Sequence, residues 1–516
     1  MSSFPWLTTL CAVPLFGAVV VAGMPSSLRR LAKTLALAFS LTTLAMVVWV
    51  AAAFDPTVER HYQLVESYDW VPRFGVSLSL GVSGISLSLI ALAAVLSAVC
   101  ILASWQDADQ RRPQTYFALL LATEGLVLGA FAATDVFLFY VLFEAMLVPM
   151  YFLIGISGGK QRSYAAAKFL IYNLFGGLIM LAAVIGLYVQ SREQLPEETY
   201  PYGTFDLMTL ANELDVPDPT QRLLFLGFFI AFAIKAPLWP LHTWLPDAAA
   251  EAHPGAAVLM VSVMDKLGTF GMIALCLPLF PEASRWAAPG VMVLAVISIV
   301  YGALLAIGQA DIKRLVAYTS VSHFGFIVLG IFAMTSQAQA GATLYMVNHG
   351  FSTAGLFLVA GMMISRRGSR LVADYGGVQR VAPILAGTFL IFGLSSLALP
   401  GLSSFVSEFL VLVGTFTRYP AAAVVATVGI ILAAVYILLL YQRTMTGPVN
   451  DDTRGFRDLG AREAWVAAPV LAVILALGFY PKPLLDVITP TVNRTLVALD
   501  QRDPAPAVPA AEGRVR

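Results

Sequence analysis

Long apolar runs, separated by short polar segments, dominate the chain. Each run is about 20 residues long or longer, which is the length a helix needs to cross a bilayer. The runs lack the alternating pattern of a membrane strand, so we expect helices and no strands. The pattern predicts about fourteen spans, at residues 4–23, 30–53, 83–104, 113–133, 135–157, 164–189, 222–245, 255–277, 289–308, 312–334, 339–364, 381–417 (one broken span), 420–443 and 464–480.

Composition supports this interpretation. Of 516 residues, 59% are hydrophobic and only 12% are charged, and the mean hydropathy is +0.80. A soluble domain carries about 25% charged residues. We therefore expect an all-α polytopic protein that lies in a lipid bilayer. The 31 basic residues balance the 31 acidic residues, so no basic excess points to a nucleic-acid partner.

Several cofactor classes lack their sequence signals. Cys11, Cys100 and Cys276 are far apart and lie in apolar runs, and no Cys/His cluster accompanies them. The chain has neither a G-x-G-x-x-G turn after a strand nor a Walker A lysine motif. We expect no metal and no cofactor in this chain.

Basic residues predict the orientation of the spans. Loops on one side carry most of the loop cations, and the positive-inside rule assigns that side to the cytoplasm. With an even number of spans, both termini are expected on the outer side. The cations of the predicted cytoplasmic side are Arg29, Arg30, Lys33, Arg111, Arg112, Lys160, Arg162, Lys313, Arg314, Arg366, Arg367, Arg370, Arg380, Arg443, Arg454, Arg457 and Arg462.

Ionisable residues also fall inside the expected spans. A charged side chain at the centre of a membrane helix costs on the order of 3 kcal/mol, so these groups must face a protein interior or water. They are Glu124, Glu144, Lys168, Lys235, Asp265, Lys266 and Glu408, together with His323 and His349.

Two of these groups adjoin helix breaks. Lys235 precedes Pro237 and Pro240, and Glu408 follows Pro400–Gly401. A charged residue beside a broken helix, occurring twice, is typical of ion-coupled transporters built from repeated halves. Burial moves the pKa values of lysine and glutamate toward neutrality, so such groups can exchange protons. Histidines titrate near neutral pH and suit a relay from the lysines to Glu408.

Other interpretations remain open for individual residues. Lys168 can extend to the membrane surface as a structural cation. Asp265 can simply compensate the charge of Lys266, and Glu124 can be a structural hydrogen-bond acceptor. Either intramembrane histidine can have a packing role. The residues that flank the WLPDA segment, His242 and His253, mark either proton uptake from the cytoplasm or an interfacial turn.

The sequence resembles the antiporter-like membrane subunits of NADH–quinone oxidoreductase, respiratory complex I. Subunits of multisubunit Na+/H+ antiporters and membrane-bound hydrogenases belong to the same superfamily. The resemblance covers about residues 115 to 445 and rests on FEAMLVPMYFLIG, KAPLWPLHTWLPDA, DIKRLVAYTSVSHFGFIVLG, NHGFSTAGLFLVAGMM and LPGLSSFVSEFLVLVGTF. It implies fourteen helices, with helices 4–8 and 9–13 as two inverted five-helix repeats, each with a broken helix.

The same resemblance implies the domain organisation. Helices 1–3 occupy 1–112, the first half-channel 113–277 and the second half-channel 289–443. A C-terminal loop and helix 14 occupy 444–490, and a polar tail occupies 491–516.

Roles are carried over position by position. Glu144 and Lys235 match an ion pair in the first half-channel, and Lys266 matches the central lysine. His323 and His349 match positions on a polar axis. At the position of Glu408, the terminal acid of the second half-channel, the sister chains L and N usually carry lysine.

Three positions depart from the family pattern. Asp265 beside Lys266 is unlike many relatives and could retune the lysine. Ala249 replaces a histidine of the WLPDAH segment, which puts proton uptake at that position in doubt. Phe143 replaces the tryptophan that often precedes the first glutamate.

The resemblance implies proton translocation across a bacterial plasma membrane. NADH oxidation and quinone reduction in partner subunits, which hold FMN and iron–sulfur clusters, would drive it. The chain would then work in a hetero-oligomer, beside chains L and N. The alternatives are a subunit of a Na+/H+ antiporter or hydrogenase, a scaffold that no longer pumps, and a stand-alone solute carrier.

Overall fold

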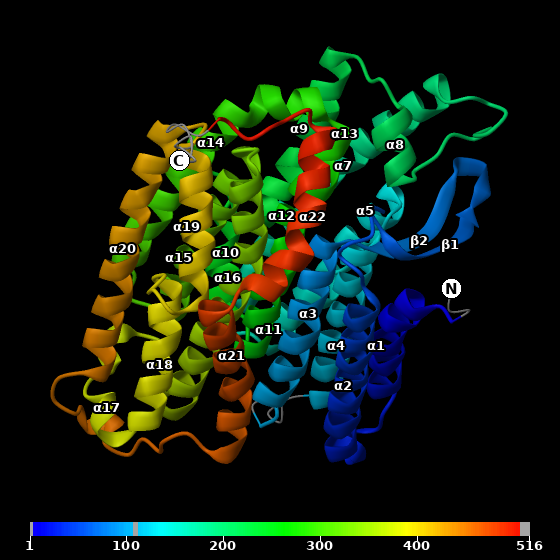
Figure 1. Cartoon of the computed structure of the whole chain (residues 1–516). Coiled ribbons are helices and arrows are strands. Elements are labelled where there is room, and N and C mark those ends of the chain that lie inside the picture. The colour runs from blue at the N-terminus through cyan, green and yellow to red at the C-terminus, as the bar shows by residue number, and fades with distance from the viewer. Residues whose placement is uncertain (1–3, 107–111, 506–516) are drawn as a thin grey trace, which may run out of the picture.

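The computed structural model describes residues 4–106 and 112–505 as a bundle of helices with a small hairpin at one end (Figure 1). Within these ranges, eleven helical segments are long and apolar enough to cross a membrane. Three shorter apolar helices join them: α1 (Trp6–Ala22), α18 (Pro383–Ser396) and α19 (Ser403–Phe416). The predicted helical membrane fold is therefore confirmed. The count of fourteen and the inverted repeats stay predictions.

The first half of the chain follows the expected spans closely, except that the helix expected over 222–245 ends at Lys235. Its elements are α2 (Arg29–Ala53), α3 (Gly84–Ala103), α4 (Pro113–Ala132), α5 (Val136–Ala145), α6 (Leu147–Ser157), α7 (Arg162–Gln194), α8 (Leu207–Glu213), α9 (Asp218–Lys235), α10 (Trp244–Glu251), α11 (Pro254–Val258), α12 (Lys266–Gly271) and α13 (Leu277–Leu279). Between α11 and α13, two π-helical stretches, Leu259–Met264 and Met272–Cys276, complete one continuous span.

The second half adds one helix that the hydropathy pattern did not indicate. The polar tail expected from residue 491 begins instead as the last turns of α22, which buries Ile488, Val492 and Leu496. The elements are α14 (Pro281–Ile307), α15 (Ile312–Phe332), α16 (Ser336–Arg367), α17 (Val378–Val381), α20 (Pro420–Met445), α21 (Ala461–Phe479) and α22 (Lys482–Ala498). Residues 506–516 of that tail lie outside the described residues.

The cation-rich loops meet at one end of the bundle. The guanidinium of Arg462 donates to the carbonyl of Ala103, and the backbone N–H of Ile312 donates to the carbonyl of Arg370. At the other end, Arg494 of α22 donates to the carbonyl of Val58. The loops predicted to share a side therefore do share one, although Arg111 lies outside the described residues. That this end faces the cytoplasm stays a prediction.

A hairpin corrects the expectation that the chain contains no strands. β1 (Gln63–Val71) pairs with β2 (Val76–Val82) in antiparallel register. The segment lies between two spans, outside the apolar runs on which the prediction rested, and β-branched and aromatic residues favour strands there. Gly75 turns the chain at φ +61°, and a Cβ there would lie 2.2 Å from the carbonyl oxygen of Gly203. Only glycine fits this turn.

Two helix breaks expose backbone groups inside the bundle, and side chains satisfy them. After α9 ends at Lys235, the indole N–H of Trp244 donates to the carbonyl of Ile234 at 2.9 Å. Between α18 and α19, Gly401 adopts φ +91°, and the Asn348 amide donates to the carbonyl of Ser403. Breaks within a membrane protein need such partners because lipid offers none.

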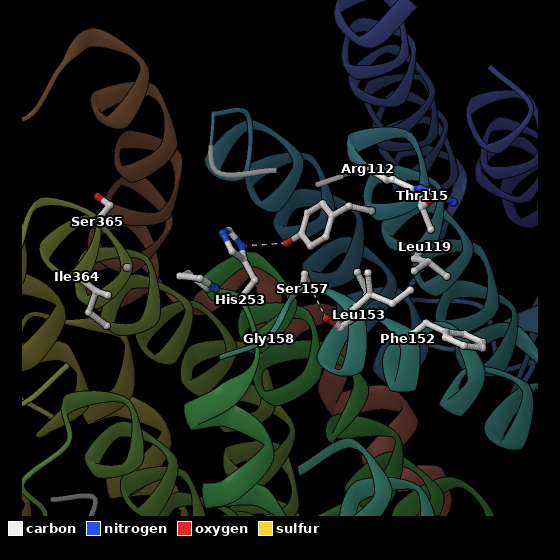
Figure 2. Close-up of a pocket in the computed structure, with 14 residues that line it drawn as sticks. Arg112, Thr115, Leu119, Phe152, Leu153, Ser157, Gly158, His253, Ile364 and Ser365 are labelled. Atoms are coloured by element: carbon white, nitrogen blue, oxygen red, sulfur yellow. Dashed lines mark hydrogen bonds between the residues drawn. The ribbon is translucent and has the colours of Figure 1, made fainter. Parts of the chain in front are cut away.

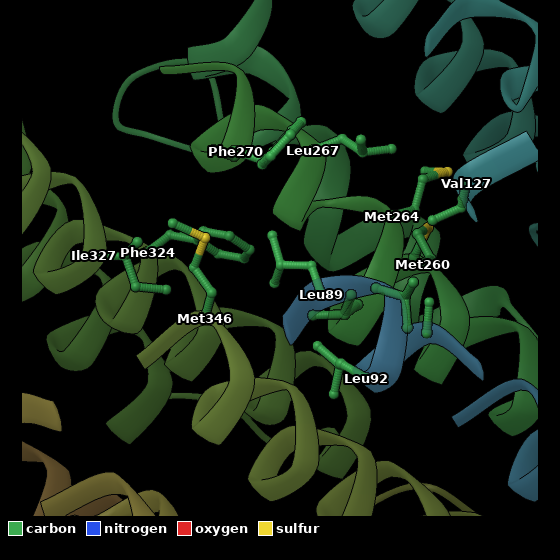
Figure 3. Close-up of a cluster of buried hydrophobic side chains, with 14 of the residues drawn as sticks. Leu89, Leu92, Val127, Met260, Met264, Leu267, Phe270, Phe324, Ile327 and Met346 are labelled. Atoms are coloured by element: carbon green, nitrogen blue, oxygen red, sulfur yellow. The ribbon is translucent and has the colours of Figure 1, made fainter. Parts of the chain in front are cut away.

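The deepest part of the core joins the two halves. Figure 3 shows apolar side chains from α3, α4, α12, α15 and α16 packed in one cluster. Glycines bring α14 and α15 close, since a Cβ at Gly325 would lie 2.7 Å from the carbonyl oxygen of Ala295. Small residues at helix contacts are the usual packing device in membranes. The core therefore holds the ionisable groups in a rigid frame.

Candidate functional site

The ionisable residues predicted inside the spans are mostly buried in the protein interior. Lys235, Asp265 and Lys266 expose no surface at all. The others with less than a tenth of their surface exposed are Glu124, His323, His349 and Glu408, and His242, which flanks the WLPDA segment, is also buried. Ionisable groups are costly to bury in a membrane protein, so they are found there mainly where they pair with one another or act on ions.

Glu408, on α19, lies in a hydrogen-bonded cluster with His323 of α15. The hydroxyl of Tyr345, on α16, donates to the Glu408 carboxylate and also contacts His323 Nδ1. His323 Nδ1 lies 3.6 Å from Glu408 Oε1. Its Nε2 faces the hydroxyls of Ser396 and Tyr436 at 3.3 and 3.4 Å. The predicted relay histidine and terminal acid are thus neighbours, joined by a tyrosine.

Lys266 and His349 form a second cluster. Lys266 Nζ lies 2.6 Å from His349 Nδ1 and donates to the carbonyl of Val261 at 3.0 Å. That carbonyl belongs to the π-helical stretch, where wider turns free backbone acceptors. The rings of His349 and His323 are 5.2 Å apart between centroids. The two clusters therefore follow each other along one buried line.

Lys235 and Glu144 do not form the closed ion pair that the family resemblance implies. Neither Lys235 Nζ nor either Glu144 carboxylate oxygen has a hydrogen-bond partner among the described residues. Lys235 Nζ lies 4.6 Å from the centre of the Phe143 ring. Glu144 lies against Gly177 of α7, where a Cβ would stand 2.0 Å from its Oε1. The structure thus shows this pair open.

Asp265 precedes Lys266 and interacts electrostatically with both Lys266 and Lys235. Both of its carboxylate oxygens are buried without a hydrogen-bond partner in the described part of the chain. Its position places a buried carboxyl group near both lysines.

Glu124, on α4, has one satisfied oxygen and one unsatisfied oxygen. Ser40 of α2 donates to Oε1 at 3.0 Å, whereas Oε2 is buried without a partner among the described residues. A role as a structural hydrogen-bond acceptor therefore accounts for Oε1 of Glu124 but not for Oε2.

Lys168 and His242 lie apart from the buried line. Lys168 Nζ is 2.7 Å from Asp247 Oδ2, and Arg314 contacts the other oxygen of Asp247 at 2.6 Å. This arrangement ties α7, α10 and α15 together at the cation-rich end, which favours the structural interpretation of Lys168. The His242 ring packs edge-on against Tyr301.

Sequence reasoning missed two members of the Glu408 cluster, Tyr345 and Tyr436. A signal existed for Tyr345, which precedes His349 by four residues and so shares its helix face. Tyr436 gave no such signal, because it lies on a separate helix far along the chain.

No group of three or more His, Cys, Asp or Glu residues in the ranges 4–106 and 112–505 could hold a metal ion. The two clusters, Lys266 with His349 and His323 with Glu408, can support proton transfer between titratable side chains.

Comparisons with known proteins identify the family to which this chain belongs. Residues 133–433 match the family model described as NADH:quinone oxidoreductase/Mrp antiporter, TM. NADH-quinone oxidoreductase subunit M of Mycobacterium tuberculosis is 52% identical over 98% of this chain and 97% of its own length. The subunit M of Pseudomonas aeruginosa is 38% identical over 94% of this chain and 95% of its own length.

Solved structures show the same fold. A chain of respiratory complex I from Thermus thermophilus with bound NADH superposes with a TM-score of 0.86, at 30% identity, covering 96% of this chain and 99% of that one. A chain of the Mrp complex from Dietzia sp. DQ12-45-1b superposes with a TM-score of 0.84, at 23% identity, covering 97% and 100%. This chain belongs to the NADH:quinone oxidoreductase/Mrp antiporter family of membrane subunits.

Proposed function

We propose that this chain is the proton-translocating subunit M in the membrane arm of a bacterial NADH–quinone oxidoreductase. It works in a hetero-oligomer, beside the antiporter-like chains L and N in the plasma membrane. Electrons pass from NADH to quinone through FMN and iron–sulfur clusters in partner subunits, and this chain holds no redox site. The names of its relatives and their near-complete coverage of the chain support the assignment.

The observation that carries the proposal is the buried line Lys266–His349–His323–Glu408. Lys266 and His349 are within hydrogen-bonding distance, and the rings of His349 and His323 are 5.2 Å apart between centroids. Tyr345 joins His323 to Glu408. A buried polar network of this kind conducts protons if water bridges the remaining gap between the imidazoles. A scaffold would be more stable with apolar residues at these positions.

The first half-channel acts as the switch. With Glu144 and Lys235 apart, the charge of Lys235 acts on Asp265, which in turn interacts with Lys266. A displacement of a neighbouring subunit moves Glu144 toward or away from Lys235, and the interaction between charges at about 4 Å is worth about 4 kcal/mol near a protein surface. Each portion of about 1.4 kcal/mol that reaches Lys266 through Lys235 and Asp265 changes the proton affinity of Lys266 about tenfold.

The proton then moves along the buried line. Lys266 gives it to His349, water carries it to His323, and Glu408 releases it to the outer side. The three steps are coupled, because each group's affinity depends on the charge of its neighbours. Asp265 holds a proton on Lys266 until the switch changes.

The experiment replaces the two switch residues in the intact enzyme. Lys235→Met and Glu144→Gln keep side-chain size, so the complex should assemble. We expect both variants to lose most proton pumping in sealed vesicles energised with NADH. Undiminished pumping in both would overturn the proposal.

A second candidate, a subunit of a Na+/H+ antiporter, rests on the shared fold of the Mrp chain. Isolation of the chain with its native partners separates the two. Co-purifying flavin and iron–sulfur chains support the oxidoreductase, whereas their absence from an intact assembly supports the antiporter.

A further inference from the structure

A pocket opens at the cation-rich end of the bundle, between α4, α6, α11 and α16 (Figure 2). Its volume is about 380 Å³, which holds several waters. Polar side chains line part of it, namely Arg112, Thr115, Tyr116, Ser157, His253 and Ser365.

The pocket ends on a short hydrogen-bonded chain. His253 Nδ1 faces the hydroxyl of Tyr116 at 3.1 Å, and the same hydroxyl lies 3.1 Å from Ser104 Oγ. Burial and the nearby Lys313 lower the pKa of His253 to about 4, so its ring is neutral at pH 7. A neutral imidazole both donates and accepts a hydrogen bond, as a proton-conducting chain requires.

A second polar layer lies deeper, on the same three helical spans. Ser97 precedes Ser104 by seven residues, Glu124 follows Tyr116 by eight, and Ser262 follows His253 by nine. Because α3 runs opposite to the other two, a rise of 1.5 Å per residue places all three roughly 10–14 Å inward of the pocket. Each carries a buried oxygen without a hydrogen-bond partner in the described residues.

Contacts confirm that the three spans meet at this depth. α3 packs against α4 and against the π-helical stretch Leu259–Met264. Cys100, one turn inward of Ser104, is hydrogen-bonded to the backbone of Leu259 and interacts electrostatically with Glu124. Three unsatisfied oxygens at one depth are the expected partners of buried water.

The polar layer is bordered by different kinds of residue on its different spans. Lys266 follows Ser262 by one helical turn and leans back to the carbonyl of Val261. Toward the other end of the bundle, the same spans carry Leu92, Val127 and Met264, which belong to the buried apolar cluster (Figure 3). The layer is therefore followed by Lys266 on one span and by apolar side chains on all three.

We propose that this pocket is the mouth of the proton inlet, and that His253 and Glu124 carry the proton from it toward Lys266. This inference rests on the proposed function and adds the route by which protons arrive. A proton from cytoplasmic water passes through the His253–Tyr116–Ser104 chain. Water in the deeper layer delivers it to Glu124 and then to the amine of Lys266.

Two variants test the route in the intact complex. Glu124→Gln keeps the oxygen that accepts from Ser40 but cannot release a proton, and His253→Leu breaks the chain at the pocket. We expect each to lower the rate of NADH-driven pumping at least threefold at normal complex content. Ser40→Ala, which removes the hydrogen bond and leaves the carboxylate, should keep at least half of the wild-type rate.

A thiol at the pocket gives a second readout. Ser365→Cys is modified with a bulky membrane-impermeant maleimide in inside-out vesicles, and the exposed Ser26→Cys serves as the control at the same end. We expect complete modification to stop pumping only in Ser365→Cys. Wild-type pumping in Glu124→Gln and His253→Leu, or after full modification of Ser365→Cys, would overturn the inlet. If Lys235→Met and Glu144→Gln still abolish pumping, the proposed function stands without it.

Discussion

The hydroxyl of Tyr345 donates a hydrogen bond to the carboxylate of Glu408, and it contacts His323 on its other side. Residues 63 positions apart are thereby joined into one unit. The Tyr345 oxygen can accept a hydrogen bond from His323 while its hydrogen is donated to Glu408. We propose that Tyr345 is a positioning residue that holds His323 and Glu408 in line for proton transfer.

This relationship predicts the effect of Tyr345→Phe. The change removes one oxygen and keeps the ring, so the fold should persist. A hydrogen bond to a charged group contributes about 1.5–3 kcal/mol, so pumping should slow about tenfold or more. The matched control is Tyr436→Phe, whose hydroxyl lies 3.4 Å from His323 Nε2 and should matter much less. Equal effects of the two substitutions would contradict the positioning role.

His349 is predicted to be indispensable because it is the one side chain that hydrogen-bonds to the Lys266 amine in the described structure. His349→Leu should remove that partner and interrupt the line, lowering pumping by about 10²-fold or more, as the loss of a proton-transfer group does. His349→Gln can still accept from Lys266 but cannot relay a proton. Initial pumping rates in reconstituted liposomes measure both. Full activity of the glutamine variant would show that His349 only packs.

Gly177 is predicted to set the position of the Glu144 carboxylate. In Gly177→Ala the new Cβ would overlap Glu144 Oε1, so the carboxylate must move. We expect a severalfold change in the pumping rate, with normal complex content on a blot of native gels. Gly155→Ala is the control, because its nearest contact would be 3.6 Å away. If Gly177→Ala pumps at the wild-type rate, as the control Gly155→Ala should, then Gly177 does not set the position of the Glu144 carboxylate.

Asp135, just before α5, predicts a pH dependence of stability. Burial raises its pKa to about 6, against hydrogen bonds from the backbone N–H groups of Leu138 and Ser77. A folded-state pKa above the unfolded value favours folding at low pH, and this contribution is lost as pH rises through about 6. Wild type should therefore gain more thermal stability than Asp135→Asn between pH 7 and pH 5. The exposed Asp215→Asn should behave like wild type.

Much of the fold could be predicted from the sequence, because hydropathy sets where a chain can cross a membrane. The prolines after Lys235 and the Pro400–Gly401 pair indicated both breaks. The hairpin was missed because its short strands lie outside the apolar runs. α22 was missed because its sequence is too polar to span a bilayer.

The candidate site, too, could be predicted only in part from the sequence. Burial of charge could be predicted, since Lys266, Glu408 and the histidines stand in apolar runs. Which groups touch could not, because such contacts depend on how distant helices pack. Tyr345 therefore escaped notice, and the open state of Glu144 and Lys235 could not be foreseen. The pocket at His253 likewise arises only where four separate helices meet.

On the function that we propose, the buried line ending at Glu408 carries the pumped protons. The most direct measurement is the NADH-driven pumping of the purified complex in liposomes, comparing Glu408→Gln with the exposed Glu282→Gln. Glutamine keeps the acceptor for Tyr345 but cannot release a proton. We expect Glu408→Gln to lose at least nine-tenths of the pumping rate, whereas Glu282→Gln should keep it. Wild-type pumping in the assembled Glu408→Gln complex would contradict it.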